Sequence, residues 1–128
     1  MAPQHPEIAI LVADDEPLTR WALMRTFEAA RFEVTLAASR DEVMQLLGSR
    51  RFQVAIVAHE LGRDSMADVL GAFVAQSPGP GLVILYGGEN PDDVRKDFPT
   101  ATVVQKPFCL EAVAAAVSSC LQPTSEAC

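Results

Sequence analysis

Two carboxylates and one lysine stand where they could do chemistry together. Asp14 and Asp15 directly follow one short apolar run, residues 8–13, and Lys106 directly follows another, residues 101–105. Two adjacent acids can hold a divalent cation through oxygen ligands, and a lysine can pair with an acid or with a phosphoryl oxygen. These residue types therefore suggest a site for a cation and a phosphoryl group.

The elements that must position these residues alternate along the chain. Short apolar runs are typical of strands buried on both faces, and they predict strands at residues 8–13, 32–37, 54–58, 82–86 and 101–105. The segments between and after them predict helices at residues 18–29, 40–47, 65–75, 92–97 and 110–121. Strands that alternate with helices in this way form right-handed parallel βαβ units and a doubly wound sheet.

Local signals predict where some of these elements begin and end. Ser39, followed three residues later by Glu42, fits a capping box at a helix start, and Gly48 fits the end of the same helix. A turn is predicted at residues 61–64, and the glycines and prolines of residues 77–81 predict a break before the fourth strand.

In a doubly wound sheet, functional groups gather beyond the carboxyl ends of the strands, near the change in strand order. With the first strand central, the acidic pair and the lysine open on the same edge. The residues expected to be informative are those just after the strands, namely Asp14, Asp15, Ala58–Glu60, Tyr86, Gly87 and Lys106.

Composition limits the classes of protein that the chain can belong to. With 128 residues, 49% of them hydrophobic and 21% charged, it fits one folded domain, with a core at about residues 7–121 and a polar tail at 122–128. We expect no membrane span, since no apolar run reaches the ~18–20 residues required. Three cysteines without a CxxC pair suit a reducing cytoplasm and make a zinc site improbable.

Charge argues against direct binding of nucleic acid. The formal net charge is −7, and Arg50 with Arg51 is an isolated basic pair. His59 has no cysteine or second histidine beside it, so we expect a surface or half-buried side chain there and not a ligand.

On these residues the chain resembles the receiver domain of two-component response regulators, from 8 to 121. Residues 11–17 resemble the first strand and acidic turn of that family, and residues 104–108 resemble the end of its fifth strand. The resemblance implies a flavodoxin-like three-layer α/β fold, with five parallel strands in the order 2-1-3-4-5 and helices on both faces. It also implies a cis peptide between Lys106 and Pro107, and a role in phosphorelay signal transduction and not as an enzyme.

The sequence departs from the family at the switch positions. Counted from Phe52 along the third strand, the phosphoacceptor aspartate of the family falls on Ala58. The Thr or Ser that ends the fourth strand falls on Tyr86, or on Gly87 if the register shifts by one residue. The switch aromatic of the fifth strand falls near Val103.

These departures remove the expected phosphoryl chemistry. A methyl group cannot attack phosphorus, so Ala58 cannot act as the nucleophile. Glu60 and Asp64 are the nearest other carboxylates, and the tight geometry of in-line transfer makes phosphorylation of either improbable.

A cation site is weakened as well. The resemblance implies that Mg²⁺ would use Asp15, the backbone carbonyl of Glu60 and, through water, Asp14. Since Mg²⁺ prefers about six oxygen ligands, we expect weak binding if any, and no required cofactor. We expect the ammonium of Lys106 to lie beside Asp14 or Asp15 in place of a cation.

Three functions are consistent with the sequence. The first is a phosphorylation-independent receiver-like module that binds a protein partner, such as a histidine kinase, another receiver or an output protein, with a homodimer also open. The second is a switch phosphorylated at another carboxylate, or one that responds to a metal or ligand. The third is a flavodoxin-like mononucleotide-binding protein, which the acidic turn at residues 14–16 disfavours because it would repel phosphate.

Overall fold

A parallel sheet forms the centre of the molecule in the computed structural model, which describes residues 8–61, 64–75 and 81–121. The strands of this sheet are β1 (Ala9–Ala13), β2 (Glu33–Ala37), β3 (Val54–Ala58), β6 (Gly81–Tyr86) and β7 (Thr102–Gln105). They lie in the order β2-β1-β3-β6-β7, and all neighbours are parallel. Counted along this sheet alone, the order is the predicted 2-1-3-4-5.

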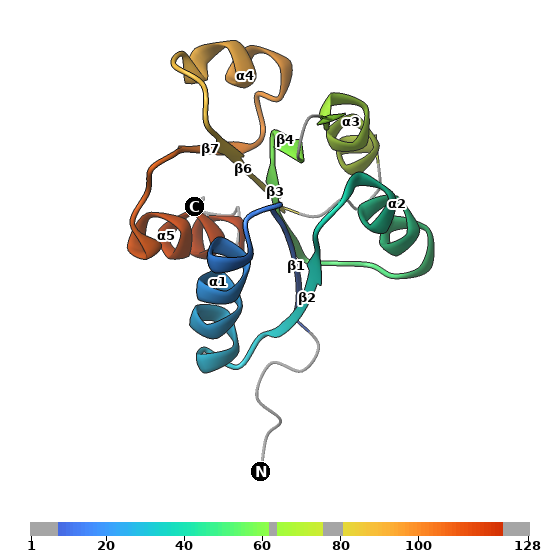
Figure 1. Ribbon diagram of the computed structural model, residues 1–128, viewed down its shortest axis with the longest axis vertical. Coiled ribbons are helices and arrows are strands. Elements are labelled where there is room, and N and C mark those ends of the chain that lie inside the picture. The colour runs from blue at the N-terminus through green and yellow to red at the C-terminus, as the bar shows by residue number, and fades with distance from the viewer. Residues whose placement is uncertain (1–7, 62–63, 76–80, 122–128) are drawn as a thin grey trace, which may run out of the picture.

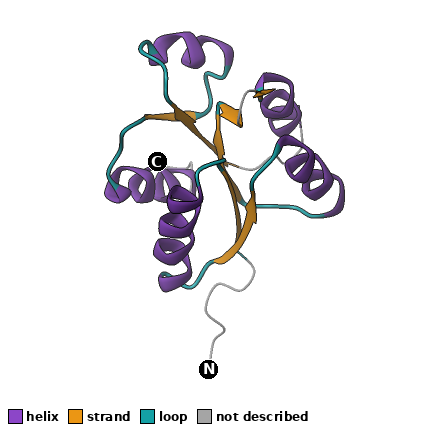
Figure 2. Cartoon of the chain, in the orientation of Figure 1, coloured by secondary structure: helices purple, strands orange, loops and turns teal. Residues whose placement is uncertain are grey.

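Helices cover both faces of the sheet. They are α1 (Pro17–Ala29), α2 (Arg40–Ser49), α3 (Ala67–Ala75), α4 (Pro91–Asp97) and α5 (Leu110–Leu121). Figure 1 shows α1 and α5 together on one side of the strands and α2 and α3 on the other, with α4 above β6 and β7. Figure 2 shows the same arrangement as purple helices on either side of the orange strands. The predicted three-layer α/β architecture is confirmed.

The alternation of side chains along each strand divides the core into two layers. Ile10 and Val12 of β1 belong to the layer under α1 and α5, where Leu23 and Phe27 also lie. The opposite layer lies under α2, α3 and α4, and its members include Leu11, Ala13, Val43, Leu70, Phe73 and Val94. Because every residue of β1 and β3 is buried, these strands read as unbroken apolar runs in the sequence.

The start of α2 follows the prediction in part. Ser39 is the N-cap, and its hydroxyl accepts a hydrogen bond from the backbone N–H of Glu42 at 3.2 Å. The reciprocal bond of the capping box is displaced by one residue, since Oε1 of Glu42 accepts from the N–H of Ala38 at 2.6 Å and not from that of Ser39.

The end of α2 differs from the prediction. Gly48 lies inside the helix, which continues to Ser49. Arg50 then turns the chain into an extended conformation, with φ of −144°, while its N–H still donates to the carbonyl of Leu46 at 2.9 Å. The helix therefore ends without a left-handed glycine.

A small hairpin follows the third strand at the predicted turn, residues 61–64, of which residues 62 and 63 lie outside the described residues. β4 (Glu60–Leu61) pairs with β5 (Asp64–Ser65) in an antiparallel sheet of their own. The predicted break at 77–81 lies outside the described residues except for Gly81, which opens β6, and the predicted tail at 122–128 lies outside them too. No described helix has the length and apolar character needed to cross a membrane.

Candidate functional site

The ends of the central strands bring the predicted residues to one edge of the sheet. β1 and β3 are in register up to Ala13 and Val57, so Asp14 and Ala58 follow side by side. On the other side of β3, Ala58 pairs with Leu85 at the end of β6.

The last strand completes the edge. Tyr86 closes β6 and pairs with Gln105 of β7, and the N–H of Lys106 donates to the carbonyl of Tyr86 at 2.8 Å. Tyr86, and not Gly87, is therefore the last strand residue here. The peptide bond between Lys106 and Pro107 is cis, as the resemblance implied.

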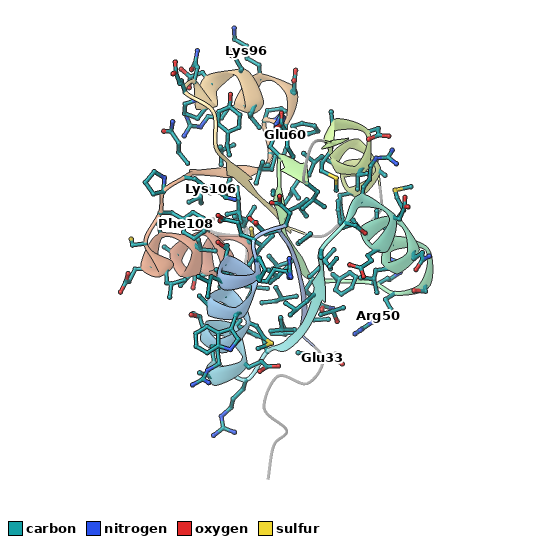
Figure 3. The ribbon with its side chains drawn as sticks, viewed as in Figure 1. Glu33, Arg50, Glu60, Lys96, Lys106 and Phe108 are labelled. Atoms are coloured by element: carbon teal, nitrogen blue, oxygen red, sulfur yellow. The ribbon has the colours of Figure 1, made fainter. Side chains whose placement is uncertain are left out.

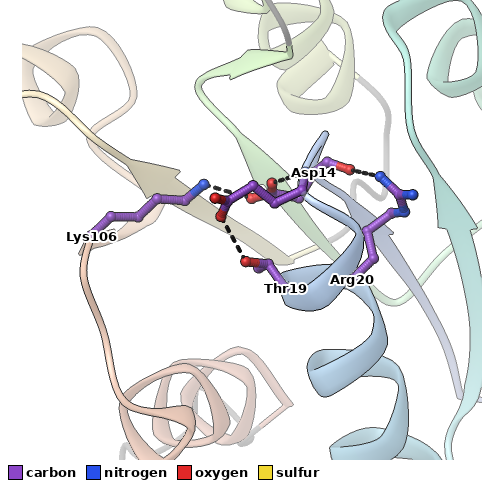
Figure 4. A network of polar contacts seen from close by, with 5 residues as sticks. Asp14, Thr19, Arg20 and Lys106 are labelled. Atoms are coloured by element: carbon purple, nitrogen blue, oxygen red, sulfur yellow. Dashed lines mark hydrogen bonds and ion pairs between the residues drawn. The ribbon is translucent and has the colours of Figure 1, made fainter.

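Asp14 is the one charged residue among the described residues that is fully buried, and its oxygens are all engaged. Oδ2 accepts from Nζ of Lys106 at 2.8 Å, and Oδ1 accepts from the N–H of Glu16 at 2.9 Å. Its backbone carbonyl accepts from Nη1 of Arg20 at 2.7 Å (Figure 4). A buried carboxylate needs such charge-assisted partners, and the ammonium of Lys106 supplies the strongest of them.

The acidic pair predicted from the sequence is split by the fold. Asp14 points into the protein, whereas Asp15 is exposed to solvent. The next acid, Glu16, accepts a hydrogen bond at 2.9 Å from the hydroxyl of Thr19, which lies beside the Asp14 network in Figure 4. Only Asp14 and Lys106 of the predicted pocket are in direct contact.

The chain's own donors occupy both side-chain oxygens of Asp14. Within the described residues, no group of three or more His, Cys, Asp or Glu side chains could hold a metal ion. Both oxygens of Asp14 are bonded to protein donors, and Glu60 belongs to β4 with an exposed side chain. A cation at this edge would therefore compete with Lys106 for Asp14.

A cavity of about 410 Å³ opens beside the end of β3. Its floor includes the methyl group of Ala58, which is 2% exposed. Lys106 from the end of β7 and Glu60 from β4 are both marked in Figure 3. The full lining is Ala58, His59, Glu60, Leu85, Tyr86, Gly87, Gly88 and Lys106.

An aromatic contact shapes one wall of this cavity. The rings of His59 and Tyr86 meet edge to face, with centroids 5.4 Å apart. A Cβ atom on Gly88 would lie 2.3 Å from the hydroxyl oxygen of Tyr86, so the ring rests directly on this glycine. Sequence reasoning placed His59 half-buried or on the surface and missed its contact with Tyr86. It also missed the contact between Tyr86 and Gly88. The sequence spacing of these two residues does not show that the tyrosine ring folds back onto the loop that follows it.

The loop after β6 is tied to the edge strand. Nε2 of Gln105 donates to the carbonyl of Gly88 at 2.9 Å and, more weakly, to that of Glu89 at 3.4 Å. Val103, the predicted position of the switch aromatic, is half-buried in β7 and packs against the layer that contains α4. The chain has valine at this position, where the resemblance implies an aromatic residue.

The comparisons with known proteins identify the fold. The chain matches no protein-family model and no curated protein in sequence. Among solved structures it is similar to the chemotaxis response regulator CheY4 of Vibrio cholerae, with a TM-score of 0.78, 21% identity and coverage of 89% of this chain and 98% of that one.

Two other similar structures hold ligands. A response regulator of Burkholderia pseudomallei, solved with a phosphorylated aspartic acid, calcium and citrate, has a TM-score of 0.75, 24% identity and coverage of 86% and 66%. The response regulator TrrA of Thermotoga maritima, solved with Mg²⁺ and BeF, has a TM-score of 0.77, 21% identity and coverage of 89% and 99%. The structural neighbours are thus response regulator receiver domains, and the chain has their fold.

Proposed function

We propose that the chain is a receiver-like protein-interaction module of two-component signalling that works without phosphorylation at residue 58. The observation that carries this proposal is the buried methyl group of Ala58 at the carboxyl end of β3. The resemblance places the phosphoacceptor aspartate of receiver domains at this position. A carbon with no lone pair cannot take up a phosphoryl group.

The nearby carboxylates do not replace the missing nucleophile. Asp14 is held by Lys106 and by the N–H of Glu16, and it has no exposed surface from which to attack a phosphodonor. Glu60 belongs to the β4–β5 hairpin, beyond the end of β3, and is exposed. In-line transfer needs a nucleophile held close to the phosphorus, so neither residue meets the requirement.

We propose that divalent cations bind weakly and are not required. The Thermotoga and Burkholderia structures contain Mg²⁺ and calcium, respectively. In this chain Asp15, the carbonyl of Glu60 and, through water, Asp14 would hold such an ion, but Lys106 already neutralises Asp14. A bound cation would therefore be attracted less strongly by the carboxylate of Asp14 and would be repelled by the ammonium of Lys106.

A protein is the partner that the surface favours. Two large apolar side chains on α1 are exposed, Leu18 by 80% and Trp21 by 53%, and Arg25 stacks on the Trp21 ring at 5.2 Å. Exposed tryptophan and arginine are typical of protein contacts, whereas the net charge of −7 disfavours nucleic acid. The proposed partner is a histidine kinase, another receiver or an output protein in the cytoplasm, and a second copy of the chain remains a candidate.

Intact mass spectrometry tests the loss of phosphorylation. After incubation with acetyl phosphate and Mg²⁺, we expect the wild-type mass to be unchanged. Ala58→Asp is the positive control, because it places a carboxylate at the same strand end. We expect added phosphoryl mass on this variant. A stable added phosphoryl group on the wild-type chain would overturn the proposal.

Partner capture tests the interaction role. The immobilised chain should retain the same proteins with and without acetyl phosphate, and Trp21→Ala with Leu18→Ser should retain less of them. Met44→Ser, on the exposed side of α2, is the control on another surface. Capture that requires the phosphodonor would contradict the proposal.

A further inference from the structure

One edge of the parallel sheet is open to pairing with another strand. β2 is the outermost strand on its side, and within the described residues β1 is the one strand that pairs with it. The N–H of Glu33 and the carbonyl of Ala37 bond to residues that flank β1, at 3.0 and 3.2 Å. Since neighbouring residues in a strand direct their backbone groups to opposite sides, the N–H and C=O groups of Val34 and Leu36 point away from β1.

The described structure leaves this edge accessible. Leu36 is 37% exposed, and a groove of about 300 Å³ separates it from the α2 side chains of Glu42, Gln45 and Ser49. Proteins usually protect an edge strand with lysine, proline or a bulge. Residues 33–37 contain neither lysine nor proline, and their pairing with β1 runs without a bulge.

The amino end of this edge is basic. Arg31 precedes β2, and Arg50 and Arg51 connect α2 to β3. One guanidinium nitrogen of Arg50 donates to Oγ1 of Thr35 at 2.8 Å, and another lies 3.4 Å from Oε1 of Glu33 (Figure 3). Three arginines and one glutamate give this end a net positive charge.

The carboxyl end of the same edge is acidic. Asp41 and Glu42 occupy the first turn of α2, shortly after β2 ends. Arg40 beside them is engaged by Asp68 of α3, so it leaves their charge uncompensated. Glu42 lines the groove together with Leu36, which places its carboxylate beside the edge. Charge therefore changes sign along β2.

A second copy of the chain fits this edge in the antiparallel direction. A two-fold axis at Thr35 sets Val34 of each copy opposite Leu36 of the other. The outward N–H and C=O groups of these residues then bond across the interface in two hydrogen-bonded pairs. The same direction brings Arg50 of each copy toward Glu42 of the other, whereas the parallel direction would bring like charges together.

We propose that two copies of this chain form a homodimer by antiparallel pairing of their β2 strands, which joins the two sheets into one. A strand of five residues spans about 17 Å, so the interface is of the small class, below about 1,200 Å². We expect a dissociation constant of about 10–100 μM. The pairing needs neither a phosphoryl group nor another protein, so it does not rest on the proposed function.

Sedimentation velocity and amide hydrogen exchange test the pairing. The full chain should change from monomer to dimer over a concentration range of about 1–500 μM. Exchange at the amides of Val34 and Leu36 should slow about threefold or more as the dimer forms, because their N–H groups gain partners only across the interface. The amide of Thr35, which faces β1 in each copy, should change less.

Charge variants test the direction of pairing. Arg50→Glu and Glu42→Lys each place like charges at both symmetric contacts and should weaken the dimer about tenfold or more. An equimolar mixture of the two variants restores opposite charges at both contacts and should dimerise within about threefold of the wild type. Such rescue cannot come from a folding defect in either variant. Arg95→Glu on exposed α4 is the matched control and should dimerise as the wild type does.

Four results would overturn the inference. They are a chain that stays monomeric over the whole range, a dimer without slower exchange at Val34 and Leu36, a mixture of the charge variants that dimerises no better than either alone, and a dimer that Arg95→Glu disrupts and Arg50→Glu does not. None of them concerns phosphorylation at residue 58, so failure here would leave the proposed function intact.

Discussion

At the scale of single residues, Asp14 shows what the acidic turn does in this chain. A fully buried carboxylate is costly unless charged or polar donors surround it. Lys106 and the N–H of Glu16 bind its side chain, and Arg20 binds its carbonyl. The pair links the end of β1 to the residue after β7, across the positions of β3 and β6 in the sheet. Its first role is therefore structural.

Removing Lys106 should reveal the free-energy cost of burying the Asp14 carboxylate. Lys106→Met leaves the charge of Asp14 buried with one donor fewer, and we expect a loss of about 2–4 kcal/mol in the free energy of unfolding. Urea denaturation measures it. The double variant Asp14→Asn with Lys106→Met should recover a large part of the loss, because no unpaired charge remains. Strictly additive losses would show that the two side chains do not stabilise one another.

The residue at position 58 sets the charge of the same region. Ala58→Asp places a second carboxylate beside Asp14, where two charges about 4 Å apart repel by roughly 4 kcal/mol at a surface-like dielectric before screening. We expect a lower thermal midpoint in metal-free buffer, together with measurable binding of Mg²⁺ or Mn²⁺ that the wild type lacks or shows only weakly.

Ala58→Asn is the control for this experiment. It has nearly the same shape as aspartate without the charge, so it should lose less stability and gain no cation binding. A midpoint of Ala58→Asp without metal that equals or exceeds that of the wild type would contradict the argument.

At the scale of elements, β1 and β3 were predictable because every residue in them is buried, so each reads as an unbroken apolar run. The five predicted strands match those of the parallel sheet within one residue at each end, although β2 and β7 contain polar residues and are only partly buried. The short helix α4 and the last helix α5 were also predicted nearly to the residue, since Pro91 and the turn at Lys106–Pro107 mark where they can begin.

The failures lie where long-range packing overrides local signals. Gly48 has the residue type of a helix end, but the helix continues one residue further, to Ser49, and ends where Arg50 adopts an extended conformation. The β4–β5 hairpin depends on cross-strand pairing that no periodicity shows in two-residue strands. The separation of Asp14 from Asp15 depends on which side chain the turn aims at Lys106, and sequence spacing cannot decide that.

Two glycines test how packing decides at this scale. A Cβ on Gly81 would lie 2.5 Å from Cβ of Cys120, so Gly81→Ala should push α5 from β6 and cost about 1–3 kcal/mol. Nothing lies within 4 Å of a Cβ on Gly48, an exposed residue inside α2, so Gly48→Ala should add about 0.5–1 kcal/mol. Chemical denaturation of both variants measures the difference.

The reactivity of the Cys120 thiol is a second measure of the contact between Gly81 and Cys120. Burial raises the pKa of this thiol above its ordinary value, so the reactive thiolate is scarce at pH 8 and its alkylation should be slower than that of the exposed Cys109. Gly81→Ala should speed alkylation of Cys120, measured by mass spectrometry of labelled peptides. Equal stability of the two glycine variants, with unchanged labelling, would contradict the packing argument.

At the scale of the whole molecule, the chain has the fold of receiver domains, and three of its residues differ from those that the resemblance implies at the switch positions. The carboxyl ends of β3 and β6, the cavity and Lys106 all lie at one edge of the sheet. Ala58, Tyr86 and Val103 stand at the three positions where the resemblance implies an acceptor aspartate, a Thr or Ser and an aromatic residue. Gln105 fixes the loop after β6 to β7 by hydrogen bonds to two carbonyls. A signal arising in the cavity therefore has no mobile aromatic side chain at Val103 to carry it to α4.

The proposed function predicts a molecule whose assembly does not respond to a phosphodonor. We expect the sedimentation coefficient of the wild-type chain, whether monomer or homodimer, to be the same with and without acetyl phosphate and Mg²⁺. Amide shifts in α4 and β7 should also stay unchanged, because a ligand gains control of a surface only if it binds one conformation of that surface better than another.

The control is Ala58→Asp, to which a phosphoryl group can attach. This variant still has tyrosine at position 86 and valine at position 103, and so lacks the Thr or Ser and the aromatic residue that would couple the phosphoryl group to α4. We expect added mass on this variant without dimerisation and without shifts in α4. If Ala58→Asp alone restored a phosphodonor-dependent change of assembly, position 58 would be the whole difference from a switch. If the wild type changed assembly with acetyl phosphate, the cavity would be coupled to the α4–β7 face by a route other than these three residues, and the module would be regulated after all.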